Sequence, residues 1–305
     1  YIAPVPGNTL KLTIAASIQS FAERAMRECI AVNNAKAVSC IVMDVNTGGI
    51  LAMCMKPDYD PNEPPRNDVA ALNELMRITL ISDAYEPGST FKLVSLLALT
   101  DDKKLPITQQ YNAHEGRRVQ VGARGPHVQD DHNIGSMIDM KTATAQSSNV
   151  YFAEAIYQNY KDDPQRYLNF LKRLHMYEDV GFTNMEEKLP RIPDPKKKEG
   201  VGRWSTHSLP NMGYGYAIEM PPIRTIVLYN AVANGGRMMA PRLIKEIRRG
   251  EEVKESFSPR VLVDKICSDE ALAIVQECLE ETARTGTSKR YFTDSLTFRV
   301  GSKTG

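Results

Sequence analysis

One apolar run with two polar side chains at its start constrains this chain more than any other feature. Residues 85–100 read YEPGSTFKLVSLLALT, and from 91 to 99 the run is apolar on nearly every side. A helix of that composition is typical of a core, because a surface helix keeps one polar face. The proline–glycine pair ahead of it favours a turn. We therefore expect a central buried helix, with Ser89 and Lys92 at its beginning.

Ser89 and Lys92 permit two interpretations. Three residues apart on a helix, they share a face and can touch. Burial disfavours a lysine ammonium, and the resulting neutral amine is a base that can activate a neighbouring serine as a nucleophile. Alternatively, Ser89 only caps the helix and Lys92 extends its head to water. The pattern Ser-x-x-Lys occurs by chance roughly once in a chain this long, so other features must decide.

Composition excludes several classes of function. The 305 residues are 42% hydrophobic and 25% charged, as in ordinary globular proteins, and the net charge of +1 predicts no nucleic-acid partner. Five scattered cysteines without a C-x-x-C pair argue against a zinc site or a disulfide framework, although Cys40 and Cys54 can face each other across a hairpin. No apolar run is long enough to span a bilayer, and the start at Tyr1 suggests a piece of a longer protein.

The periodicity of apolar residues predicts strands at both ends of the chain and helices between them. Strands are expected at 10–14, 38–45, 50–55, 242–248, 252–255 and 296–303. Helices are expected at 18–30, 70–81, 91–99, 137–145, 150–160, 164–174, 221–233 and 268–286. This order predicts an α/β fold. We expect a single domain, 1–305, with an α/β lobe from about 1–85 and 212–305 and an inserted all-helical lobe from about 86–211.

Two further short motifs follow the first. Ser147-Ser148-Asn149 lies between two expected helices, and Lys303-Thr304-Gly305 ends the last expected strand. Each is weak evidence alone, because such groups are common in loops and at strand ends. All three in this order match the catalytic motifs of penicillin-binding proteins and class A β-lactamases.

The whole chain resembles the transpeptidase domain of class B penicillin-binding proteins. The resemblance is carried by the segments Glu86–Lys92, Leu12–Ile14, Thr47–Ala52, Met212–Gly215 and Ala233–Gly236. It implies an antiparallel sheet flanked by helices plus the helical lobe, and a peptidoglycan D,D-transpeptidase that β-lactams acylate. The Gly-Tyr-Gly and Ala-Asn-Gly-Gly blocks are more similar to septal, FtsI-type enzymes than to those of cell elongation.

The resemblance also implies roles for the first two motifs. Ser89 would attack the D-Ala–D-Ala bond of a donor stem peptide and form an acyl-enzyme. Lys92 would take the serine proton, and Ser147 would relay a proton to the leaving D-alanine. Asn149 would hold the amide side of the substrate. No metal or organic cofactor is implied.

The resemblance implies that the third motif would bind the terminal carboxylate of the donor peptide or of a β-lactam. Lys303 and Thr304 would contact it, and Gly305 would let the ligand lie close to the strand. Ser302 departs from the family, which usually has glycine there. The resemblance further implies another threonine after Gly305, which would supply an oxyanion-hole N–H, and then more strands and a helix.

The resemblance places the catalytic domain on the periplasmic side of the bacterial inner membrane, behind an N-terminal anchor and a pedestal domain. The expected partners are stem peptides, an amine acceptor, β-lactams and divisome proteins. Two alternatives remain. One is a related hydrolase, a D,D-carboxypeptidase or β-lactamase, although Glu154 and Glu178 lie in no context typical of a water-activating glutamate. The other is a non-catalytic penicillin sensor.

Overall fold

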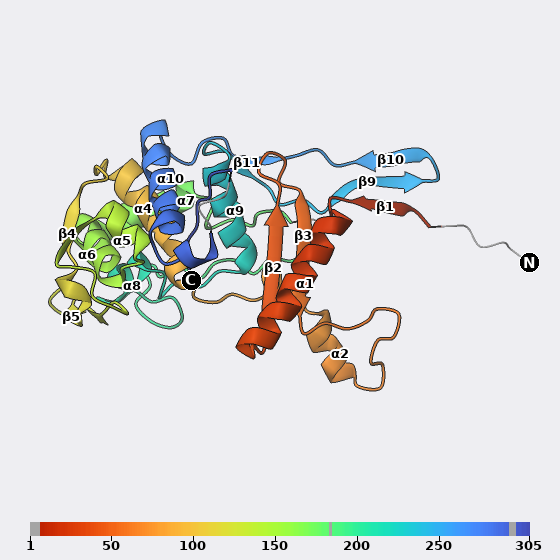
Figure 1. Ribbon diagram of the computed structural model, residues 1–305, viewed down its shortest axis with the longest axis horizontal. Helices are drawn as coiled ribbons and strands as arrows, with labels where there is room; N and C mark the ends of the chain where they lie inside the picture. The colour runs from red at the N-terminus through yellow and green to blue at the C-terminus, as the bar shows by residue number, and fades with distance from the viewer. Residues whose placement is uncertain (1–6, 183–184, 293–296) are drawn as a thin grey trace, which may run out of the picture.

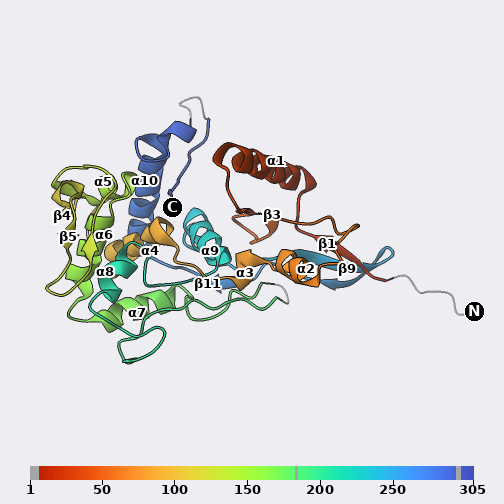
Figure 2. The ribbon, with the colours of Figure 1, turned by 90° about the horizontal axis from the view of Figure 1, so that it is seen from below.

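The molecule has a helical end and an arm of strands. The structure is a computed structural model that describes residues 7–182, 185–292 and 297–305. Figures 1 and 2 both show the arm pointing away from the helical end of the molecule. It is an antiparallel sheet in the order β1–β9–β10, formed by β1 (Thr9–Leu12), β9 (Ile244–Arg249) and β10 (Glu252–Ser256). An early and a late segment of the chain therefore share one sheet, as expected.

A hairpin and a long helix lie between the arm and the helical end. The hairpin is formed by β2 (Val38–Met43) and β3 (Ile50–Lys56), and α1 (Ala16–Asn33) packs against it. The side-chain amide of Gln19 on α1 joins the two elements, because it accepts from Met53 N at 2.9 Å and donates to Met53 O at 3.2 Å. Cys40 and Cys54 are directly opposite each other, as predicted, and both are free thiols.

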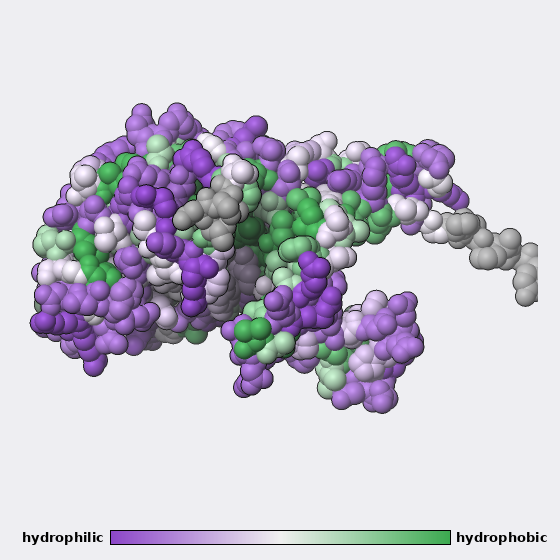
Figure 3. Space-filling view, viewed as in Figure 1, coloured by the Kyte–Doolittle hydropathy of each residue, from purple (hydrophilic) through white to green (hydrophobic). Residues whose placement is uncertain are grey.

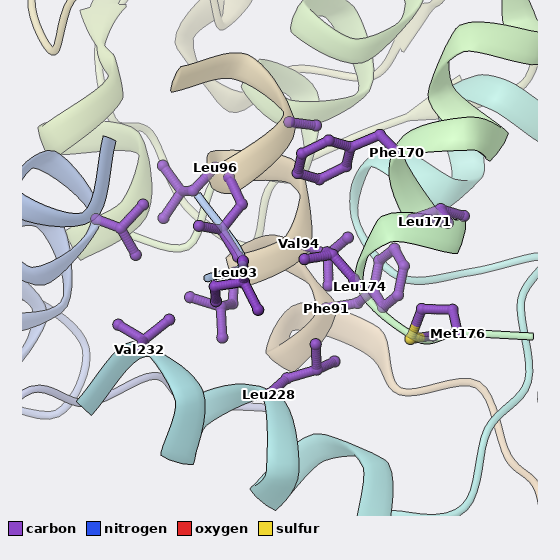
Figure 4. Packing of buried hydrophobic residues seen from close by; sticks show 14 of the residues in the cluster. Phe91, Leu93, Val94, Leu96, Phe170, Leu171, Leu174, Met176, Leu228 and Val232 are labelled. Atoms are coloured by element: carbon purple, nitrogen blue, oxygen red, sulfur yellow. The ribbon is translucent and has the colours of Figure 1, made fainter. Parts of the chain in front are cut away.

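The predicted central helix is present and buried on all sides. It begins as a 3-10 turn (Gly88–Phe91), continues as α4 (Lys92–Leu97) and ends in a π-helical turn (Ala98–Asp102). Figure 4 shows its apolar side chains packed between residues of α7 (Pro164–Arg173) and α9 (Pro222–Ala233). The other helices are α2 (Val69–Met76), α3 (Thr79–Ser82), α5 (Met140–Ala145), α6 (Asn149–Tyr160), α8 (Ser208–Gly213) and α10 (Asp269–Arg284).

The expected all-helical lobe also contains short strands, which corrects the sequence prediction. The helix expected at 137–145 begins only at Met140, because the side chain of Asp139 caps it by accepting from Thr142 N at 2.8 Å. Residues 137–139 form β7 (Met137–Asp139) instead. Strand β7 pairs with β4 (Gln110–Asn112), and β5 (Val119–Gln120) pairs with β6 (His127–Val128). A further pair joins β8 (Met238–Met239) and β11 (Val261–Val263).

The prediction of a strand at 296–303 is wrong for residues 297–303, which form no strand. Leu296 lies outside the described residues. The backbone of this segment bonds to a helix and not to a strand, because Ser302 N donates to Leu279 O on α10 at 3.0 Å. A pocket of about 440 Å³, lined by Ile41 of β2, Tyr229 and Ser302, separates it from the hairpin. Figure 3 shows a hydrophobic hollow in this region. The strands therefore form several small sheets instead of a single antiparallel sheet.

The helices of the described residues include none with both the length and the apolar composition needed to span a bilayer.

The central helix supplies a test of the core. Leu96 is 0% exposed, whereas Leu10 on the arm is 54% exposed. We expect Leu96→Ala to lower the free energy of unfolding in urea by about 2–5 kcal/mol, because it leaves a cavity. Leu10→Ala, the matched control, should cost less than about 1 kcal/mol. Equal losses in the two variants would contradict this assignment of the core.

Candidate active site

The turn that carries Ser89 is held by the segment that follows α8. Tyr85 and Met220 exchange backbone hydrogen bonds at 3.2 and 3.0 Å, and Gly88 N donates to Gly215 O at 3.0 Å. Gly215 has φ +93°, and a Cβ there would lie 1.8 Å from the carbonyl oxygen of Gly88. Glycine is therefore required at 215, which gives the Gly-Tyr-Gly block a structural reason. Ser89 is thereby placed on a clamped turn.

Lys92 is buried directly beside Ser89. Its side chain is 0% exposed, so the alternative in which its head reaches water is wrong. The Nζ atom lies 2.9 Å from Ser89 Oγ, 2.6 Å from the Ser147 carbonyl oxygen, 3.2 Å from Ser147 Oγ and 2.7 Å from Asn149 Oδ1. The first two predicted motifs thus meet at one nitrogen atom.

Burial holds the pKa of Lys92 well below its usual value, and the nearby Lys303 cation lowers it further. The charges of Asp130 and Asp131 oppose this shift. A neutral amine has two N–H groups, and the two shortest contacts lead to the Ser147 carbonyl and Asn149 Oδ1. Its lone pair is then left for the Ser89 hydroxyl. This geometry suits proton removal from Ser89.

The second motif is supported by an aspartate that the sequence patterns did not reveal. Asp130 accepts from Ser148 Oγ at 2.8 Å and from Val150 N at 3.1 Å, and also from Asn149 N. These bonds anchor the N-terminus of α6, which Ser148 caps. Ser147, just before the helix, has a left-handed backbone with φ +59°. Asp130 lies in a stretch for which the sequence predicted no helix or strand, and its role depends on contacts with residues 18 to 20 positions away.

The third motif approaches from the other side of Ser147. Lys303 Nζ donates to Ser147 Oγ at 2.8 Å and to the Thr304 carbonyl at 2.9 Å. Burial lowers the pKa of Lys303 to about 8, so this lysine is mostly charged at pH 7. A Cβ on Gly305 would lie 3.0 Å from Thr90 Cγ2, which puts the end of the motif against the catalytic turn.

The structure brings all seven predicted site residues together, in two groups. Five form one hydrogen-bonded network: Ser89, Lys92, Ser147, Asn149 and Lys303. Thr304 and Gly305 lie at its edge, and Thr304 Oγ1 is 2.8 Å from Thr287 Oγ1. Within the described residues, no cluster of three His, Cys, Asp or Glu side chains could hold a metal ion.

Comparison with known families identifies the chain. Residues 38–305 match the family described as penicillin binding protein transpeptidase domain. The chain belongs to this family. The expected class B membership is also confirmed by its relatives.

Three curated relatives illustrate the similarity. The chain is 23% identical to stage V sporulation protein D of Bacillus subtilis over all of its length and 45% of that protein. It is 26% identical to the probable peptidoglycan D,D-transpeptidase PenA of Neisseria gonorrhoeae, over 78% of the chain and 38% of PenA. A peptidoglycan D,D-transpeptidase FtsI homolog of Mesostigma viride is 23% identical, over 97% of the chain and 50% of that protein. The chain thus spans half or less of the length of these relatives.

Solved structures share the fold. A putative peptidoglycan glycosyltransferase of Atopobium parvulum has a TM-score of 0.77 at 21% identity, over 95% of this chain and 63% of that one. Penicillin binding protein 3 of Mycobacterium tuberculosis in complex with aztreonam has a TM-score of 0.76 at 22% identity, over 93% of this chain and 60% of that one. The predicted penicillin-binding-protein fold is thereby confirmed.

Two substitutions of Asp130 should separate its effect on the pKa of Lys92 from its effect on the position of the second motif. Asp130→Asn removes a negative charge that raises the pKa of Lys92. The pKa of Lys92 should fall further, so that acylation of the protein by a penicillin persists to lower pH. Asparagine keeps one acceptor oxygen for the backbone N–H groups of α6, whereas Asp130→Ala removes every bond to the second motif and should in addition lower the rate on the pH plateau by about tenfold or more.

Asp131→Asn is the matched control, because Asp131 acts on Lys92 only through charge. It should move the acid limb of the pH profile in the same direction and leave the plateau rate unchanged. A limb that moves to higher pH in either asparagine variant would contradict the electrostatic account.

Proposed function

We propose that the protein is a serine-type peptidoglycan D,D-transpeptidase that cross-links stem peptides through an acyl-serine intermediate. One observation carries the proposal: a fully buried lysine amine lies 2.9 Å from the hydroxyl of Ser89 at the start of a buried helix. Family membership supports it, as do the names of the PenA and FtsI-type relatives.

The acylation step follows from the arrangement of three side chains. Lys92 takes the proton of Ser89 while Ser89 Oγ bonds to the carbonyl carbon between the two D-alanines. The C–N bond then breaks, and the departing amine needs a proton. Ser147 Oγ is suited to relay it, because it lies between Lys92 Nζ at 3.2 Å and Lys303 Nζ at 2.8 Å. An amine of a second stem peptide then attacks the acyl carbon and frees Ser89.

The remaining residues bind the donor peptide. Asn149 holds its amide side and also orients Lys92, whose Nζ donates to Asn149 Oδ1 at 2.7 Å. Lys303 supplies a positive charge and Thr304 a hydroxyl for the terminal carboxylate. Gly305 has no side chain, so the peptide can approach the backbone there. A β-lactam carries the same carboxylate and stops at the acyl stage.

The setting of this activity is also part of the proposal. Residues 1–305 act as one transpeptidase domain, with an α/β lobe of about 1–85 and 212–305 and a mainly helical lobe of about 86–211. The whole protein is anchored in the bacterial inner membrane, with this domain on the periplasmic side. It acts in septal wall synthesis with divisome proteins.

The assignment of the nucleophile has a direct test. Penicillin should add one acyl group, detected by intact-protein mass spectrometry, and Ser89→Ala should abolish the adduct because the attacking oxygen is gone. Ser95→Ala is the control, because Ser95 lies on α4 but donates to Gly213 O instead of facing the site. Persistence of the adduct in Ser89→Ala would refute the assignment.

A D-alanine release assay, together with the lifetime of the penicillin adduct, separates the alternatives. A transpeptidase given a D-Ala–D-Ala peptide and an acceptor amine should release D-alanine and form the cross-linked product. A carboxypeptidase would release D-alanine with water as the acceptor, and a β-lactamase would shed the penicilloyl group within minutes. A penicillin sensor would hold the adduct and release no D-alanine.

A further inference from the structure

A turn that the proposed mechanism does not use contacts the third motif and the segment just before the second motif. We call residues 285–288, which follow α10, the bridging turn. Thr287 N donates to the carbonyl of Ala145, two residues before Ser147, at 3.0 Å. On its other side, Thr287 Oγ1 lies 2.8 Å from Thr304 Oγ1. One residue thereby joins the two segments that carry the second and the third motif.

Backbone contacts hold the bridging turn in this position. A Cβ on Gly286 would lie 2.2 Å from the Ala145 carbonyl oxygen, so the close approach requires glycine. Thr285 N and Gly286 N both donate to the Glu281 carbonyl, at 2.9 and 3.2 Å. The buried Ser288 donates to the Thr282 carbonyl at 3.0 Å. The side chain of Thr287 therefore starts from a fixed backbone.

Ser288 adds a second contact from the bridging turn to the third motif. Its hydroxyl is hydrogen-bonded to that of Ser302, the residue that stands where the family usually has glycine. Ser302 thus has a partner, and the segment that leads to Lys303 is tied to the turn by two hydroxyl pairs.

The Thr287–Thr304 pair has two possible directions, and only one leaves Thr304 able to bind an anion. A hydroxyl has a single hydrogen, and an ionised carboxylate can only accept. If Thr304 donates to Thr287, its hydrogen is lost to the ligand. If Thr287 donates to Thr304, the hydrogen of Thr304 is free for the carboxylate. Lys303 Nζ donates to Ser147 Oγ and to the Thr304 carbonyl, so its ammonium keeps one N–H for the carboxylate, and the Thr304 hydroxyl can supply a second, directional donor.

We propose that Thr287 is a positioning residue that donates to the Thr304 hydroxyl and thereby directs it at the ligand's carboxylate. Thr287 acts through Thr304 and sets specificity for carboxylate-bearing ligands over neutral ones. The proposal rests on the function proposed above, in which Thr304 binds this carboxylate.

The test compares benzylpenicillin with its methyl ester, in which the carboxylate is masked. In the parent protein the acid should acylate Ser89 faster than the ester. Thr287→Val keeps the shape and removes the hydroxyl, and should slow acylation by the acid by up to about tenfold, the effect of losing the one hydrogen bond between hydroxyls that orients Thr304. The loss should appear as weaker initial binding, with the limiting acylation rate and the reaction with the ester unchanged.

Two further variants control the measurement. Thr287→Ser retains the hydroxyl and should restore the acid-to-ester ratio of the parent. Thr285→Val removes a hydroxyl of the same turn that contacts Glu281 and no motif residue, so the ratio should not change. Melting temperatures of the variants show whether each one folds, and the ratio is independent of the fraction folded.

An unchanged acid-to-ester ratio in Thr287→Val would overturn the proposal. Thr304→Val then identifies which part has failed. If Thr304→Val lowers the ratio and Thr287→Val does not, Thr287 has no positioning role and the proposed function stands. If neither variant lowers the ratio, Thr304 does not bind the carboxylate, and the proposed binding site is wrong as well.

Discussion

The removal of water from one lysine amine is the condition on which the rest of this site depends. Lys92 has no exposed surface because the helix that carries it is enclosed on all sides by the core. Desolvation is the largest cause of its lowered pKa, ahead of the charge of Lys303. The core is thus part of the chemistry, because it holds the catalytic turn in place and favours the neutral form of the base.

The two lysines of the site perform different tasks because their surroundings differ. Lys303 is only partly buried and its pKa falls to about 8, so it keeps most of its charge at pH 7. Ser147 Oγ lies between the two amines, and of these Lys92 is the one whose neutral form is favoured by complete burial. Lys92 can therefore act as a base while Lys303 binds an anion. If both lysines that contact Ser147 Oγ were charged, they would repel each other strongly.

Local patterns were sufficient to predict the elements whose signals lie within one segment. The buried helix, the β2–β3 hairpin and the catalytic turn depend on neighbouring residues, and all were predicted. The start of α5 was missed because Asp139 caps it, which the apolar periodicity does not reveal. The final strand was wrong because the alternation of residues 297–303 carries no information about a partner, and here Ser302 bonds to α10.

The same distinction applies to the site. The three motifs could be recognised as short sequence patterns, and the structure brings them together. The roles of Asp130 and Thr287 could not be predicted, because neither residue belongs to a sequence motif and each acts only through contacts formed in the folded protein. Their contacts with the second and third motifs join residues 18 and 17 positions apart, well beyond the reach of a local sequence pattern. Such supporting residues become apparent only from the folded arrangement.

The protonation state of Lys92 at neutral pH tests the central claim most directly. Proteins labelled with ¹³C at the lysine Cε carbon give one signal per lysine, and the signal missing from Lys92→Arg identifies Lys92. Its shift should be that of a neutral amine at pH 7 and should change only at lower pH. A Lys92 signal that titrates near pH 10, as for an ordinary lysine, would contradict the claim that burial makes this residue the base.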